Sequence, residues 1–217
     1  MFDLHTHSLL SDGVLLPSEI ARRYEDKGYR AVAITDHVDY SNIGLVVKAM
    51  SEFIRNWQNS SGIKVLSGVE LTHLPLGQFG PLAQYCRQEG IQVIVAHGET
   101  VAEPVLKGTN RAALEADIDI LAHPGLISRE DAELAKEKGI FLELTSRSGH
   151  RDTNDHVAKQ ALKAGARLIL NNDSHEPDDI ITPAKLNEIG LQAGLTREEL
   201  DKIYQDTEKF VNRRQSS

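Results

Sequence analysis

Short apolar runs alternate along the chain with longer amphipathic segments. Val93 to Ala96 and Leu168 to Leu170 are continuous apolar runs that end in polar residues. This pattern is typical of strands buried on both faces of a parallel sheet. Runs of this kind predict strands over residues 2–7, 31–37, 64–70, 92–97, 118–123, 140–145 and 167–173.

The amphipathic segments predict a helix after each strand. We expect helices near residues 16–27, 45–58, 81–88, 109–116, 128–138, 154–163, from 183, and 196–211. Ser128 and Thr196 begin capping motifs, and Thr182-Pro183 is a further helix start. The polar tail to residue 217 is expected to fray.

Seven strands that alternate with helices predict an α/β protein with parallel strand pairing. No linker or change of composition divides the chain, so residues 1–217 are expected to form one domain. A full eight-unit barrel usually needs about 250 residues. The shorter chain therefore favours a distorted (β/α)7 barrel, with an open doubly wound sheet as the alternative.

Composition and charge narrow the function. The formal net charge of -8 argues against a general nucleic-acid-binding surface. Cys86 is the single cysteine, which rules out an internal disulfide and suits a reducing cytoplasm. No apolar run approaches the length of a membrane span, and the N-terminus lacks the pattern of a signal peptide. We expect a cytoplasmic protein without a membrane partner.

Metal-ligating side chains gather where the predicted strands end. His5 and His7 are two residues apart, so on a strand both side chains leave the same face. In α/β folds the carboxyl ends of the strands form the edge where sites are built. A buried parallel strand has no structural reason to end in histidine, yet six of the nine histidines lie at such ends. The candidate ligands are His5, His7, Asp12, His37, Glu70, His97, His123, Asp173 and His175.

Imidazole nitrogens and carboxylate oxygens suit zinc, manganese and iron. The candidates are enough for two or three divalent ions, and a carboxylate such as Glu70 could bridge two of them. Such a cluster can hold a hydroxide at neutral pH and clamp phosphoryl oxygens. Phosphoester hydrolysis is therefore the first reaction to consider.

The same residues carry a resemblance to a known family. His5-Thr6-His7, Ile34-Thr35-Asp36-His37, Gly68-Val69-Glu70, Val95-Ala96-His97-Gly98, Leu121-Ala122-His123-Pro124 and Asn172-Asp173-Ser174-His175 resemble the motifs of the PHP (polymerase and histidinol phosphatase) family, in the family's order. The resemblance implies a distorted seven-stranded barrel and a trinuclear metal phosphoesterase.

The resemblance also implies how the ligands divide. His5, His7, Glu70 and Asp173 would hold one ion. Glu70 would bridge to a second ion bound by His97 and His123. Asp12, His37 and His175 would hold the third.

Other polar residues are candidates for substrate contacts. Arg147 follows the sixth predicted strand, and its guanidinium suits phosphate oxygens. His73, His150 and Arg151 are further candidates, each with an ordinary loop or rim role as the alternative. Glu70, Asp173 and Arg147 are the residues expected to carry catalysis.

The residues and the family resemblance together predict hydrolysis of a small phosphomonoester by a metal-bridging hydroxide. The resemblance implies histidinol phosphate or a nucleotide-like metabolite as the substrate. One alternative is a nuclease or 3′-5′ exonuclease on short nucleic acid. A metal-stabilised regulatory module without enzymatic activity is the other.

Overall fold

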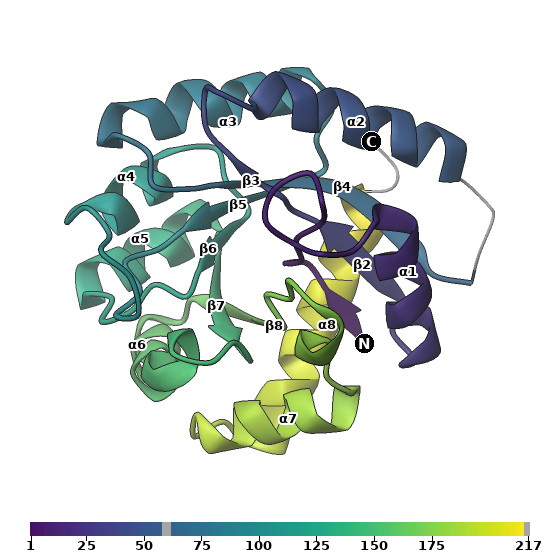
Figure 1. Cartoon of the computed structure of the whole chain (residues 1–217). Coiled ribbons are helices and arrows are strands. Elements are labelled where there is room, and N and C mark those ends of the chain that lie inside the picture. Colours follow the sequence, from purple (N-terminus) through teal and green to yellow (C-terminus); the bar gives the residue numbers. More distant parts are fainter. Residues whose placement is uncertain (58–61, 215–217) are drawn as a thin grey trace.

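The structure is a computed structural model that describes residues 1–57 and 62–214. A parallel sheet that nearly closes on itself forms the centre of the molecule (Figure 1). Every strand pair is parallel, and the order β1-β2-β4-β5-β6-β7-β8 has β3 paired with β4. This arrangement confirms the predicted distorted (β/α)7 barrel and not the alternative, an open doubly wound sheet. The strands are β1 (Phe2–Asp3), β2 (Ala31–Ile34), β3 (His37–Val38), β4 (Lys64–Leu71), β5 (Val93–His97), β6 (Ile120–Ala122), β7 (Phe141–Thr145) and β8 (Arg167–Asn171).

The seam between β1 and β8 is closed by an isolated bridge and separate hydrogen bonds, and the described residues form no continuous strand ladder there. Beyond the two strands, Thr6 and Ser174 form an isolated parallel bridge. His7 N donates to Ser174 O at 2.9 Å, and Asp173 N donates to His5 O at 3.0 Å. The first strand, predicted over residues 2–7, is therefore a two-residue strand continued by a bridge.

The second predicted strand is divided into β2 and β3 by Thr35 and Asp36. Both side chains bond to the segment that follows β1. Thr35 Oγ1 accepts from Thr6 N at 3.1 Å, and Asp36 Oδ1 accepts from Ser8 N at 2.7 Å. These bonds tie the two neighbouring strand ends together, which a pattern read along one segment does not reveal.

The main helices surround the sheet (Figure 1). Ser128 and Thr182 cap α5 and α7 as predicted, each accepting a hydrogen bond from a backbone N–H in the first turn. The last helix was predicted to end near residue 211, but it continues to Arg214, so the first residues of the predicted tail are helical. The predicted end of the second helix at residue 58 and the rest of the tail, 215–217, lie outside the described residues. The helices are α1 (Pro17–Asp26), α2 (Ile43–Trp57), α3 (Phe79–Gln88), α4 (Thr109–Glu115), α5 (Arg129–Lys138), α6 (Asn154–Ala164), α7 (Pro183–Gln192) and α8 (Arg197–Arg214), with short 3₁₀ turns η1 (Leu76–Gln78), η2 (His150–Thr153) and η3 (Pro177–Asp179).

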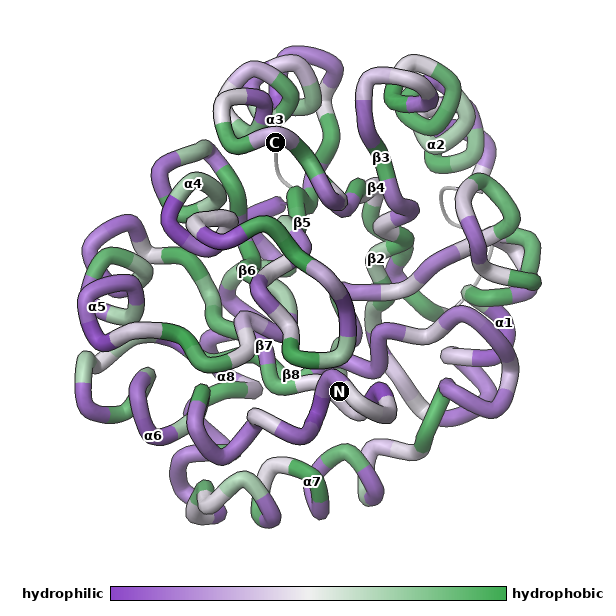
Figure 2. Tube along the Cα trace, turned by 60° about the vertical axis from the view of Figure 1, so that its left-hand side comes forward, coloured by the Kyte–Doolittle hydropathy of each residue, from purple (hydrophilic) through white to green (hydrophobic). Residues whose placement is uncertain are grey.

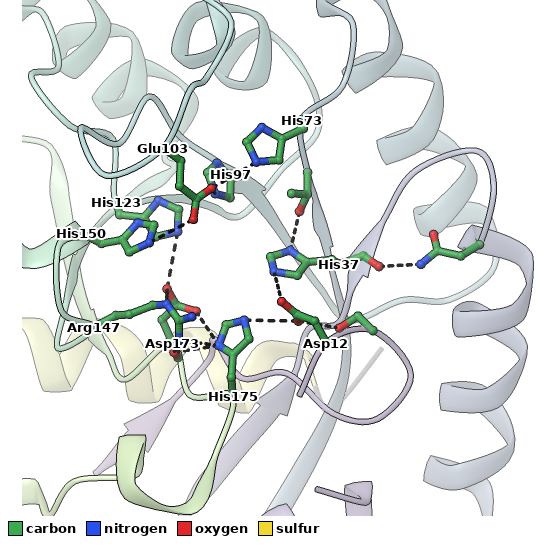
Figure 3. Close-up of a pocket in the computed structure, with 13 residues that line it drawn as sticks. Asp12, His37, His73, His97, Glu103, His123, Arg147, His150, Asp173 and His175 are labelled. Atoms are coloured by element: carbon green, nitrogen blue, oxygen red, sulfur yellow. Dashed lines mark hydrogen bonds and ion pairs between the residues drawn. The ribbon is translucent and has the colours of Figure 1, made fainter. Parts of the chain in front are cut away.

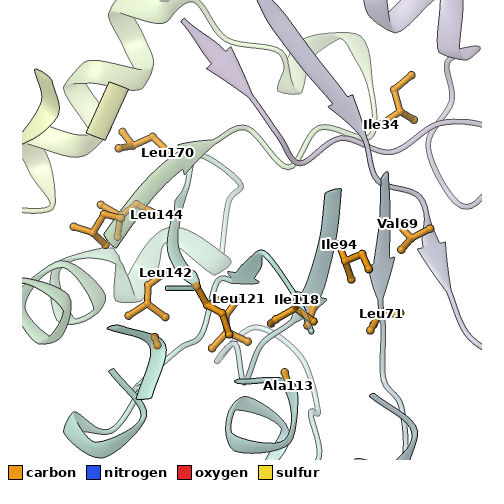
Figure 4. Close-up of a cluster of buried hydrophobic side chains, with 14 of the residues drawn as sticks. Ile34, Val69, Leu71, Ile94, Ala113, Ile118, Leu121, Leu142, Leu144 and Leu170 are labelled. Atoms are coloured by element: carbon orange, nitrogen blue, oxygen red, sulfur yellow. The ribbon is translucent and has the colours of Figure 1, made fainter. Parts of the chain in front are cut away.

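Two apolar layers hold the barrel. The larger one lies between the sheet and the helices and includes Ile34, Ile94 and Leu142 (Figure 4). The other fills the barrel interior and includes Leu4 and Val95. Hydrophobic stretches follow the strands in Figure 2, whereas the helices alternate between hydrophilic and hydrophobic positions. Within the described residues, no helix combines the length and apolar character needed to cross a membrane.

Helix α8 covers the end of the barrel where the strands begin. Its Phe210 and Val211 belong to the interior cluster, and the Phe210 ring meets Phe141 edge-on at 5.6 Å. Arg214 pairs with the buried Asp119. Because α8 covers this end, the carboxyl ends of the strands are left for a site at the opposite end.

Candidate metal centre

The structure brings all the candidate ligands together at the carboxyl ends of the strands. Figure 3 shows those that line the cavity, which are Asp12, His37, His97, His123, Asp173 and His175. Their donor atoms form overlapping groups in which all atoms lie within 4.8 Å of one another. The groups are His7, Asp12, His37 and His175; His5, His123 and Asp173; His5, His7 and Glu70; and Glu70, His97 and His123.

Glu70 lies at the centre of these groups and is fully buried. Its Oε2 lies 3.3 Å from His5 Nε2 and 3.6 Å from His7 Nε2. Its Oε1 faces His123 Nε2 at 3.7 Å. One carboxylate thus presents its two oxygens to different histidines, which is the arrangement that a bridging ligand needs.

Asp173 faces the same centre from the end of β8. Its Oδ1 lies 3.2 Å from His7 Nε2 and 3.7 Å from His5 Nε2. Its Oδ2 lies 3.7 Å from His123 Nε2. Asp173 and Glu70 therefore flank the same three imidazoles.

A third group lies nearer to the surface, around the half-exposed Asp12. Asp12 Oδ1 is 3.3 Å from His175 Nε2, and Asp12 Oδ2 is 3.6 Å from His37 Nε2. Asp36 steadies the loop that carries Asp12, because its carboxylate accepts bonds from Ser8 and Ser11 at 2.7–2.8 Å. The position of Asp12 is thus set by the loop after β1.

Several buried polar atoms in this centre have no hydrogen-bond partner. They include His5 Nε2, both ring nitrogens of His7, and Oε1 of Glu70, whereas Oε2 of Glu70 lies 2.7 Å from His37 Nδ1. Donors on a tetrahedral ion with bonds of about 2.1 Å lie about 3.4 Å apart, close to the separations found here. Unpaired buried polar atoms are costly, and a cation would satisfy them. The donor set therefore fits divalent metal ions.

Contacts behind the ligands orient their rings. His5 Nδ1 lies 2.8 Å from Glu143 Oε1, and His37 Nδ1 lies 2.7 Å from Thr72 Oγ1. His97 Nδ1 faces Gly98 O at 3.1 Å. At His5 and His97 the Nδ1 contact leaves Nε2 directed at the centre, as is usual for metal-binding histidines. His37 differs, because its Nδ1 also lies 2.7 Å from Glu70 Oε2 while its Nε2 faces Asp12 Oδ2 at 3.6 Å.

Glu143 is a residue that the sequence reasoning passed over. It lies in β7 and also accepts hydrogen bonds from Asn171 Nδ2 at 2.7 Å and from His123 N at 3.1 Å. The sequence does contain a signal for Glu143, because a single carboxylate lies between Leu142 and Leu144 in a buried strand. Side chains alternate along a strand, so Glu143 points to the opposite face from the two leucines, into the barrel.

Electrostatics divides the ligands of the metal-free centre into two groups. At His5 and His37 burial lowers the pKa, but neighbouring carboxylates, Glu143 and Glu70 respectively, outweigh it and raise the pKa of each ring. Burial lowers the pKa of His7 and His123 well below the ordinary value, and neighbouring histidines lower it further. Both rings are therefore neutral near pH 7. Burial raises the pKa of Glu70, but His5 and His37 outweigh it and hold that pKa well below its usual range. Glu70 is therefore ionised.

Three residues at this edge have left-handed backbones. The φ angles of His73, His123 and Asp173 are 51°, 27° and 54°. Non-glycine residues rarely adopt such angles, and they concentrate at functional sites. Here they follow β4, β6 and β8, where each strand ends at the centre.

A cavity of about 310 Å³ opens over the centre and contains most of the predicted substrate contacts. His73, Arg147 and His150 line it (Figure 3). Arg147 Nη1 lies 2.7 Å from His175 Nδ1 and 3.3 Å from Asp173 O. Its guanidinium therefore stands directly beside the candidate ligands.

Arg151 was predicted to contact substrate, but it does not line the cavity over the centre. It lines a separate cavity with Ile189 and Gln192. Successive residues of a 3₁₀ turn point about 120° apart, so His150 and Arg151 in η2 leave in different directions.

Glu103 is a second residue that the sequence reasoning did not identify. The loop between β5 and α4 carries it to the cavity wall, where it faces His73, His97 and His150 (Figure 3). Its carboxylate lies 3.2–3.3 Å from one ring nitrogen of each. The hydrogen bond with His97 is the main cause that lowers the pKa of Glu103 to about 2.

These features define a class of protein: a parallel barrel with a histidine-carboxylate metal-binding edge. The PHP domain matches residues 3–118, more than half of the chain. An uncharacterized protein of Methanocaldococcus jannaschii is 44% identical over 205 residues, with 92% of this chain and 93% of that protein covered. The chain belongs to the PHP domain family.

More distant relatives carry functional names. "DNA polymerase/3'-5' exonuclease PolX" of Bacillus subtilis is 28% identical over 193 residues, which cover 80% of this chain but 34% of that protein. "Probable phosphatase" of Acetivibrio thermocellus is 24% identical over 199 residues, covering 80% and 78% of the two chains.

Solved structures share the fold. Histidinol phosphate phosphatase from Lactococcus lactis, complexed with zinc, L-histidinol and phosphate, superposes with a TM-score of 0.65 at 16% identity and covers 90% of this chain and 94% of that one. A chain of an archaeal ribonuclease P complex with mature tRNA gives a TM-score of 0.70 at 20% identity, covering 97% and 90%. At these identities the likeness concerns the barrel alone.

Proposed function

We propose that this protein is a metal-dependent phosphatase that hydrolyses a small phosphomonoester. The observation that carries the proposal is the buried Glu70, whose oxygens face His5, His7 and His123 beside a cavity that also contains Arg147. A positive guanidinium next to a cation-binding centre suits a phosphoryl group, which needs charge neutralisation on several oxygens.

Two to three divalent ions, zinc, manganese or iron, would occupy the donor groups. The first would be held by His5, His7, Glu70 and Asp173, and the second by Glu70, His97 and His123. The third would be held by Asp12, His37 and His175. When bound, such ions polarise phosphoryl oxygens and supply a hydroxide nucleophile at neutral pH.

The residues of the chain then have separate tasks. Glu143 keeps the ring of His5 turned with Nε2 toward the centre, and Thr72 contacts Nδ1 of His37, whose Nε2 faces Asp12. Arg147 binds phosphoryl oxygens at the cavity wall and orients the ester for in-line attack. The modest volume of about 310 Å³ favours a compact substrate.

The test combines metal removal with matched arginine variants. After dialysis against a chelator, manganese, zinc or iron is restored while p-nitrophenyl phosphate and histidinol phosphate are assayed. Activity should disappear with the metal and return with it. Arg147→Ala should raise KM about tenfold or more, whereas Arg151→Ala, from the same loop but outside the cavity, should leave KM unchanged.

Phosphatase activity that survives complete metal removal would overturn the mechanism. Faster hydrolysis of single-stranded DNA than of any phosphomonoester would replace the proposal with a nuclease. The relative named as a 3'-5' exonuclease makes that substrate a necessary part of the panel.

A further inference from the structure

The side chain of Glu103 enters the cavity from outside the set of strand-end ligands. It belongs to the loop between β5 and α4, whereas the candidate ligands follow the strands themselves. Its Oε2 lies 3.2 Å from His97 Nε2, the nitrogen that faces the second ion position. This separation matches that of two donors on one ion, about 3.4 Å for bonds of about 2.1 Å. Glu103, His73 and His97 form a donor group of their own, whose atoms lie within 4.8 Å of one another and which shares His97 with the group of Glu70 and His123.

Two further imidazoles hold this carboxylate in place. His73 Nε2 lies 3.2 Å from Oε2, and His150 Nε2 lies 3.3 Å from Oε1. His150 is almost fully buried, and its Nδ1 has no hydrogen-bond partner. Imidazoles that converge on one anionic group from separate strand ends form an anion-binding position.

The loop that carries Glu103 is fixed at its base and exposed at its tip. Glu99 Oε1 accepts from Gly108 N at 3.0 Å and from Asn110 N at 2.9 Å, which joins the two ends of the loop. Between them Val101 is 54% exposed. A loop of this kind can move its tip without disturbing the strand that bears His97.

We propose that Glu103 is an exchangeable carboxylate ligand of the ion held by Glu70, His97 and His123, and that the phosphoryl group of the substrate takes its place. A small movement of the exposed loop tip would bring the carboxylate onto that ion when no substrate is bound. A phosphoryl oxygen would then take the position of the carboxylate, and His73 and His150 would contact the incoming anion. This inference rests on the proposed function for the identity of the incoming group.

If Glu103 is an exchangeable ligand, phosphate must compete with the Glu103 carboxylate for the same position. A ligand that binds only after an internal group has left has an apparent affinity reduced by the fraction of molecules in the open state. Glu103 therefore tightens the ion and weakens phosphate, two opposite effects of one side chain.

The experiment measures both effects by calorimetry, without turnover, on the full chain. The probes are zinc, titrated against a competing chelator, and inorganic phosphate, titrated at saturating zinc. E103Q should weaken the zinc site about tenfold or more and tighten phosphate about tenfold. Unchanged zinc affinity would overturn the assignment of Glu103 as a ligand, and unchanged or weaker phosphate binding would overturn the exchange.

E103D separates ligation from charge. Aspartate keeps the negative charge but is one methylene shorter, so it withdraws from His97 and the ion. It should resemble E103Q in both titrations, and wild-type behaviour would show that only the charge matters and refute the proposal. Thermal unfolding of the metal-free variants checks their fold. A wild-type protein that binds zinc and phosphate but hydrolyses no ester would contradict the proposed function alone.

Discussion

Replacing Glu143 with glutamine should weaken metal binding although Glu143 contacts no ion position directly. The carboxylate accepts three hydrogen bonds, from His5 Nδ1 and Asn171 Nδ2 on one oxygen and from His123 N on the other. Glutamine has one oxygen and one NH₂ group. Its oxygen can serve His5 and Asn171, but its NH₂ then faces the N–H of His123.

The magnitude follows from that mismatch. A buried N–H left without an acceptor costs about 1–3 kcal/mol, so the metal-free protein should lose about that much free energy of unfolding. If the NH₂ group turns toward His5 instead, the ring is driven to the tautomer with Nε2 protonated, which cannot bind a cation. Loss of such an orienting partner typically costs 10–100-fold in metal affinity, or about 1.4–2.8 kcal/mol.

The assay is a chelator competition for zinc, together with urea unfolding of the metal-free protein. Glu99→Gln is the matched control, because Glu99 accepts two backbone N–H bonds on one oxygen and contacts no candidate ligand. Zinc affinity should fall for the Glu143 variant and not for the control. Equal zinc affinity in wild type and the Glu143 variant would refute the reasoning about ring orientation.

Three other predictions test the interior and the centre. Phe210→Ala should lower the free energy of unfolding by about 3–5 kcal/mol and Tm by about 6–20 °C, because the ring is buried against Phe141. Leu191→Ala, at an exposed position, is the control, and a small change in the Phe210 variant would show that α8 is not needed to close the barrel. Burial raises the pKa of Cys86 to about 12, so its thiol should resist a disulfide reagent at pH 8 in the folded protein and react after denaturation. Rapid reaction of the thiol with the reagent in the folded protein would contradict its burial. Zinc at a hundred times its Kd should stabilise the protein by about 2.7 kcal/mol in thermal unfolding, because the buried unpaired atoms of His7 and Glu70 gain a partner. An unchanged Tm would count against a metal centre.

The strand-end residues could be found from the sequence because their signal is local. A polar residue at the end of an apolar run, such as Glu70 or His97, is placed by its own strand, and parallel pairing brings the ends together. Family resemblance added the grouping of these residues. The alternation of strands and helices predicted parallel pairing, whereas the choice of a barrel over an open sheet came from the chain length and the family resemblance.

The features that escaped prediction depend on contacts between distant segments. Glu103 lies in a loop without periodicity, and only the folded chain brings it to His73 and His150. The division of β2 from β3 comes from bonds between Asp36 and the loop at Ser8. No pattern within a single segment encodes these contacts.

The weak seam of the barrel gives the proposed ions a second consequence. Leu4 and Asn171, which are joined across the seam by a hydrogen bond, are 167 residues apart in the chain. His5 and His7 lie on one side of that join and Asp173 on the other. An ion bound by all three would act as a removable cross-link between the first and last strands. Amide hydrogens at this seam, including those of His7 and Asp173, should therefore exchange more slowly with solvent when metal is bound.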